Sequence, residues 1–230
     1  MLELQSLPAP STSEETTEVA TITTLKEILP APLPVVIDAW DQRPSFLKFG
    51  DNVGTGDSTI RESLANVATS APFLYIGLNT PRNNTYNRIY AQSLMGVGVA
   101  SSMYHTSRGA TRPFFRWCDY AMIGASSMCM SKALNPGLSN WWLLLSASLL
   151  PVQPMLVTAV HAAAMEVKFA RRSLAQPDRY QKAHRMHAAS TFLGCVCFLA
   201  EEVYPDVPFI HAAWHVAAAL AIHTSNALLK

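Results

Sequence analysis

The sequence predicts an all-α protein, a polytopic bundle of seven transmembrane helices that follows a disordered N-terminal tail. Half of the 230 residues are hydrophobic and only 14% are charged, whereas a soluble domain typically has about a quarter charged residues. The apolar residues gather in long runs, and the basic residues are confined to the short stretches between these runs. The formal net charge of +1 gives no reason to expect nucleic acid as a partner.

Residues 1–58 form the predicted tail. This segment is rich in Pro, Ser, Thr and Glu, and a segment with so little apolar surface to bury stays disordered. Its first residues lack a basic start followed by an apolar run, so we expect no cleaved secretory leader. Several prolines interrupt any helix here: Pro8, Pro10, Pro30, Pro32 and Pro34.

Seven apolar runs make up the predicted transmembrane domain, residues 59–230. Several of them are short for a hydrocarbon core that needs about 20 residues. The fourth run meets the fifth across Pro151 and Pro154 with almost no loop, so six spans would also fit. The runs cover residues 60–79, 89–106, 114–134, 138–151, 153–172, 184–203 and 207–229.

Loop charge orients the predicted bundle. The connection after the fifth run carries one acid, Asp178, and many bases, and an excess of Lys and Arg marks a cytoplasmic loop. The ends of the second and sixth runs then lie at the opposite face, and the sequon at Asn83 faces the cytoplasm unglycosylated. This basic connection either anchors the topology or attracts anionic lipid. Its bases are Lys168, Arg171, Arg172, Arg179, Lys182 and Arg185.

Polar residues from three runs should meet at one membrane face. Ser101 and His105 close the second run, Asp119 opens the third, and His211 and His215 open the seventh. In the predicted topology these three run ends lie at the same face. Ionisable residues inside a membrane are costly and by default line a cavity. We therefore expect the five residues to form one site.

The spacing of the histidines suits a metal ion. His211 and His215 are four residues apart, so both imidazoles lie on one face of a helix. His105 would complete three protein ligands and leave the fourth tetrahedral position to water, the arrangement of a catalytic zinc site. Asp119 would accept a hydrogen bond from that water or act as its base. Ser101 would orient the water or polarise a substrate carbonyl.

Plainer interpretations exist for each of these residues. The two histidines of the seventh run could simply bond to neighbouring helices, Asp119 could pair with Arg116, and Ser101 could serve helix packing. Further polar groups could form a second cluster, His161 with Glu166. We expect His184 and His187 at the membrane interface. His223 should either line the cavity that holds His211 and His215 or be a hydrogen-bonded core histidine. The cysteines should be reduced, packed thiols, at Cys118, Cys129, Cys195 and Cys197.

The combination of SxxxH, an aspartate and HxxxH resembles the CREST superfamily of seven-helix membrane proteins. This group contains alkaline ceramidases, progestin and adiponectin receptors, haemolysin III-like proteins and phospholipases that remodel GPI anchors. The resemblance covers about residues 60–229 and implies zinc held by His105, His211 and His215, with Ser101 and Asp119 nearby. Tyr120 follows Asp119 where ceramidases have an Asp-Glu pair, so ceramide is not favoured. Asn66 and Ser70 fall where polar residues recur in such bundles.

The sequence thus leads to a first hypothesis, a zinc-dependent intramembrane hydrolase of a lipid amide or ester bond. Its partners would be a membrane lipid and the bilayer, and its location the endoplasmic reticulum, the Golgi or the plasma membrane. The alternative is a seven-helix receptor with a structural zinc ion and little turnover. A membrane scaffold with a vestigial site is a third hypothesis.

Overall fold

The computed structural model describes residues 57–230, so nearly all of the predicted tail lies outside the described residues. The described part is built from α-helices and two short 3-10 helices, without strands, which confirms the all-α class. Seven α-helices follow one another along it. They are α3 (Ile60–Asn79), α4 (Thr85–Thr106), α5 (Arg112–Leu134), α6 (Asn140–Leu149), α7 (Pro154–Ala175), α8 (Pro177–Val203) and α9 (Ile210–Ser225), with the 3-10 helices η2 (Gly109–Thr111) and η3 (Asn226–Leu229).

Each predicted apolar run corresponds to one of these helices. The match is weakest for α6, whose 10 residues span about 15 Å, half of a hydrocarbon core of about 30 Å. By length and composition, α8 is the one described helix that could cross a membrane. The other long helices carry inward-facing polar residues that lower their hydropathy. The multi-pass bundle therefore stays a prediction.

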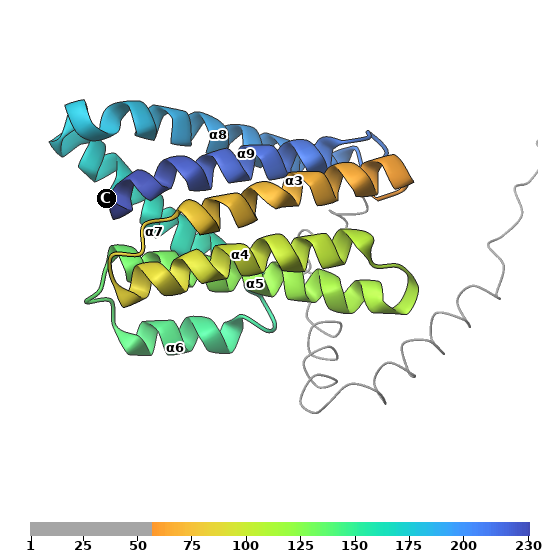
Figure 1. Cartoon of the computed structure of the whole chain (residues 1–230), viewed down its shortest axis with the longest axis horizontal. Helices are drawn as coiled ribbons and strands as arrows, with labels where there is room; N and C mark the ends of the chain where they lie inside the picture. Colours follow the sequence, from red (N-terminus) through yellow and green to blue (C-terminus); the bar gives the residue numbers. More distant parts are fainter. Residues whose placement is uncertain (1–56) are drawn as a thin grey trace, which may run out of the picture.

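Six of the helices form a closed ring. In the order of the ring, α3 packs against α4, α4 against α5, α5 against α7, α7 against α8, α8 against α9, and α9 against α3. The short α6 lies outside this ring and touches α5 and α7 (Figure 1). The starts of α3, α5 and α9 and the ends of α4 and α8 lie at one end of the bundle (Figure 1). The predicted site residues belong to this end.

Local sequence explains where the helices begin. At α3 the Thr59 hydroxyl accepts the Glu62 N–H (3.2 Å), and the Glu62 carboxylate accepts the Thr59 N–H (2.9 Å), a capping box. Three other helices carry proline in the first turn, at Pro113, Pro154 and Pro177, where a missing N–H costs nothing. The capping box fixes the direction in which the chain enters α3, and it therefore positions Asp57.

Candidate metal centre

Three buried histidines converge at the end of the bundle just described. His105 lies in the last turn of α4, and His211 and His215 lie in the first two turns of α9. Their side chains are 0%, 4% and 1% exposed, so no bulk water solvates these polar rings. One nitrogen of each ring lies within 4.8 Å of the other two. These residues, called here the histidine cluster, can hold a metal ion.

The hydrogen bonds of the rings leave one nitrogen of each free to bind a metal. Nδ1 of His105 lies 2.9 Å from a carboxylate oxygen of Asp57, and Nδ1 of His211 lies 2.9 Å from one of Glu201. An ionised carboxylate only accepts, so both Nδ1 atoms carry the proton. Nε2 of both rings is buried and has no hydrogen-bond partner among the described residues.

His215 follows the same pattern through a hydroxyl group. Its Nδ1 lies 3.0 Å from the Thr69 hydroxyl, which donates its own hydrogen to the Ala65 carbonyl at 2.8 Å. Thr69 therefore accepts, and the ring again carries its proton on Nδ1. Metal-bound histidines almost always donate their other ring N–H to such a partner, which fixes the tautomer and the ring orientation. The donor set thus fits a metal ion with three imidazole ligands.

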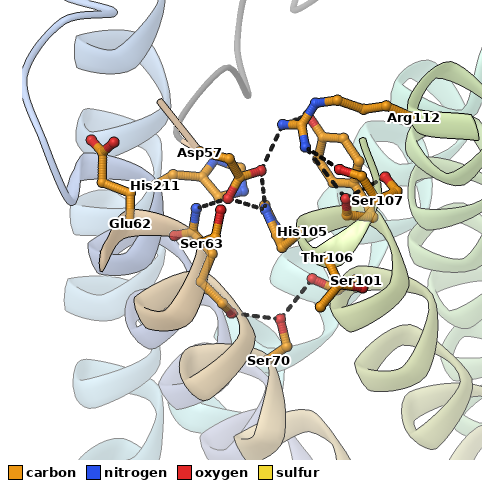
Figure 2. A network of polar contacts seen from close by, with 12 residues as sticks. Asp57, Glu62, Ser63, Ser70, Ser101, His105, Thr106, Ser107, Arg112 and His211 are labelled. Atoms are coloured by element: carbon orange, nitrogen blue, oxygen red, sulfur yellow. Dashed lines mark hydrogen bonds and ion pairs between the residues drawn. The ribbon is translucent and has the colours of Figure 1, made fainter. Parts of the chain in front are cut away.

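Asp57 joins the histidine cluster to α5. Its carboxylate accepts from Arg112 of α5 at 2.6 Å and from the Asn66 amide at 3.0 Å, besides His105 (Figure 2). Burial works to raise the pKa of the Asp57 carboxyl, but His105 and Arg112 hold this pKa well below its usual range. The carboxylate is therefore ionised while it orients the imidazole.

Ser101 is placed beside the cluster and is hydrogen-bonded to Ser70 of α3. The two hydroxyl oxygens are 2.8 Å apart (Figure 2), and Ser70 donates its hydrogen to the Asn66 carbonyl at 2.8 Å. Ser101 must then donate to Ser70, which leaves its oxygen only as an acceptor. In this arrangement Ser101 can orient a water molecule or an amide N–H, but it cannot donate to a substrate carbonyl.

Asp119 faces the interior of the bundle. Its side chain is 2% exposed, and its Oδ1 atom has no hydrogen-bond partner among the described residues. Arg116, the partner that the plainer interpretation gave it, places its guanidinium 5.4 Å from the centre of the Tyr120 ring and donates to the Tyr120 hydroxyl at 3.4 Å. A buried carboxyl oxygen without a partner is costly and is typical of a functional site.

A cavity of about 160 Å³ begins at these residues and runs along the inside of the ring. Ser101, Asp119 and His215 line one end. Along α5 the lining extends from Asp119 to Met130, which corresponds to roughly 16 Å at 1.5 Å per residue. Most of the wall is apolar, with contributions from Phe73, Leu94, Val97, Ile123 and Ala218. The site therefore joins a polar end to a long apolar pocket.

The remaining histidines differ from the expectations. His161 is bonded to Ser131 (2.8 Å) and Ser146 (3.0 Å), so it does not form one cluster with Glu166. Glu166 instead lies 2.6 Å from Nε2 of His187, whose side chain is buried inside the bundle. His223 is exposed and lines neither the cavity nor the core. The cysteines are free thiols, as predicted, although Cys195 is exposed and not packed.

Three partners of the cluster were missed in the sequence. Asp57 lies within the predicted tail, Glu201 is buried near the end of α8 without belonging to a motif, and Thr69 carries no motif either. The available signal for Glu201 was its position: it is a carboxylate at the end of the sixth apolar run, at the same end of the bundle as the histidines. Comparison of the chain with protein-family models, curated proteins and solved structures gives no significant match.

Proposed function

We propose that this protein is a multi-pass membrane hydrolase that binds zinc at His105, His211 and His215 and cleaves an amide or ester bond in a lipid. The observation that carries this proposal is the histidine cluster itself, with its Nδ1 atoms held by partners and the buried Nε2 atoms of His105 and His211 left without one, at the polar end of an apolar cavity. The motif residues also resemble those of the CREST superfamily.

The distribution of side chains supports a membrane environment. Large apolar side chains point outward from many of the helices, among them Trp141 (81% exposed), Leu174 (84%) and Phe192 (73%). The interior, in contrast, holds many buried hydroxyl, amide, imidazole and carboxyl groups. Exposed apolar surface on this scale marks contact with lipid or with another protein, and intramembrane polar groups turn toward the bundle interior. The endoplasmic reticulum, the Golgi and the plasma membrane all provide such a bilayer.

Three histidines suit zinc, which takes nitrogen ligands in a tetrahedral arrangement and keeps an open position in catalytic sites. When bound there, zinc polarises an acyl carbonyl and lowers the pKa of a coordinated water to about 7. Asp57, Glu201 and Thr69 hold the Nδ1 atoms of the three rings, and one nitrogen of each ring lies within 4.8 Å of the other two. Hydrogen-bond partners on the ring nitrogen opposite the metal raise the basicity of imidazole ligands.

Asp119 and Ser101 provide the proton handling. Asp119 has a buried oxygen without a partner and lines the same cavity as His215, so it accepts a proton from the attacking water and returns it to the leaving group. Ser101 accepts a hydrogen bond from that water or from the substrate N–H. The apolar cavity holds the acyl chain and excludes bulk water from the scissile bond.

Lipid profiling tests this function. Purified full-length protein is reconstituted into vesicles of a total lipid extract, and the products are measured by mass spectrometry. The wild type should release free fatty acid, and Asp119→Asn should retain zinc while product formation falls by about 100-fold or more. Asp206→Asn, the same change in an exposed loop, should keep full activity. Zinc-loaded wild type without any product would contradict the hydrolase and support the receptor alternative.

A further inference from the structure

A second hollow opens at the end of the bundle opposite the histidine cluster. The end of α3, the start of α8 and the end of α9 lie at this end of the bundle (Figure 1). The hollow has a volume of about 430 Å³ and is lined by these three parts and by the segment that follows α9. Among its lining residues Asp178 is the one acid. Its cationic or titratable basic side chains define the basic pocket, Arg179, Lys182, His223 and Lys230.

The basic pocket holds more cationic side chains than acidic ones, with Arg179, Lys182 and Lys230 against Asp178. Arg179 donates to the backbone oxygen of Lys230 at 2.9 Å, which brings these two residues together. Lys182 and His223 are exposed, and neither has a polar partner among the described residues. Like charges held in one concave surface repel one another unless an anion lies between them. The pocket is therefore suited to an anionic group.

The surroundings favour a lipid over a soluble anion. Ile76, Pro81 and Met186 also line the pocket, and this apolar wall would gain nothing from a free phosphate ion. Met186 is 50% exposed and Leu78 is 60% exposed, so apolar side chains continue from the pocket onto the outer surface of α8 and α3. Acyl chains can follow that surface, while a headgroup fills the pocket.

We propose that the basic pocket binds the phosphate group of an anionic glycerophospholipid whose acyl chains lie along α8 and α3. This inference rests on the proposed membrane location, although not on zinc or on catalysis. Basic pockets between membrane helices at the cytoplasmic side are known to bind anionic headgroups. The basic end of α8 is also the end that loop charge assigns to the cytoplasm.

Lipid retention tests the pocket directly. Full-length protein is reconstituted into nanodiscs of phosphatidylcholine with a minor share of phosphatidylserine, extracted in mild detergent, and analysed for bound lipid by mass spectrometry. The wild type should be enriched in phosphatidylserine. Arg179→Gln with Lys182→Gln should lower this enrichment by about tenfold. The matched control is Arg171→Gln with Arg185→Gln, which removes two exposed cations that do not line the pocket and should leave the enrichment unchanged.

The outcomes separate this inference from the proposed function. An equal loss of phosphatidylserine enrichment in both double variants, or no enrichment in zinc-loaded wild type, would overturn the proposal that the pocket binds lipid. Either result would leave the hydrolase proposal intact. Displacement of phosphatidylserine by inorganic phosphate alone would show that the site takes free phosphate, which also overturns it. Failure of the wild type to enter nanodiscs would overturn the membrane location and the inference together.

Discussion

The Asp57 carboxylate lies 2.9 Å from Nδ1 of His105, and the opposite nitrogen of that ring, Nε2, is buried without a hydrogen-bond partner among the described residues. Asp57 precedes α3 and His105 ends α4, so this contact ties two distant parts of the chain together. The imidazole is oriented before any metal arrives. A pre-oriented ligand binds a metal more tightly, because less conformational freedom is lost on binding.

Asp57→Asn should weaken metal binding without abolishing it. The amide loses the charge that holds both the His105 N–H and the Arg112 guanidinium, and loss of such a partner typically costs 10- to 100-fold in metal affinity. Competition with a zinc chelator measures the change. Asp206→Asn removes the same charge from an exposed loop and should not alter the affinity. An unchanged zinc affinity in the Asp57→Asn variant would show that Asp57 does not support metal binding.

The cavity should control which lipids are cleaved. Ala218 lines it three residues beyond His215, and Ala218→Phe would fill part of the space. Hydrolysis of long-chain lipids should fall by at least about tenfold, because the phenyl ring occupies space that the acyl chain needs in the apolar pocket, while the zinc content stays the same. Val216→Phe on the outer face of α9, where Val216 is 45% exposed, is the control. Equal rates for both variants would place the acyl chain elsewhere.

Close packing of α3 against α4 should depend on Gly77. A β-carbon at this position would lie 2.7 Å from the backbone oxygen of Ala91, so the helices must move apart. Gly77→Ala should therefore lower the free energy of unfolding by about 1–3 kcal/mol. In contrast, Gly137 has no atom within 4 Å of an added β-carbon.

Gly137→Ala is thus the matched control and should change stability by less than about 0.5 kcal/mol. Thermal unfolding in detergent compares the two variants. Similar stability of both proteins would mean that α3 and α4 pack less closely than described.

The positions of the helices could be predicted because apolar runs of helical length leave few other options. The run 60–79 matches α3 (Ile60–Asn79), and the end of the second run matches the end of α4 (Thr85–Thr106). Since helix order fixes which ends meet, the convergence of His105, His211 and His215 followed from counting the runs. Composition alone set the boundary of the tail at residue 58.

The partners that hold the rings could not be predicted in the same way. Hydrogen bonds between Asp57 and His105 or between Thr69 and His215 depend on how two helices are rotated against each other, which no pattern within one segment encodes. Glu201 shares a sequence stretch with Glu202 and Asp206, and charged residues at the end of a run normally face water. Its burial against His211 is a property of the packed bundle.

The metal content of purified protein tests the central claim most directly. Wild-type protein, extracted in mild detergent and analysed by inductively coupled plasma mass spectrometry, should contain about one zinc ion per chain, because the three histidines form a single site. His211→Ala and His215→Ala should each lose most of this zinc, whereas His223→Ala, outside the cluster, should retain it. Unchanged zinc content in the first two variants, or wild type without bound metal, would contradict the account.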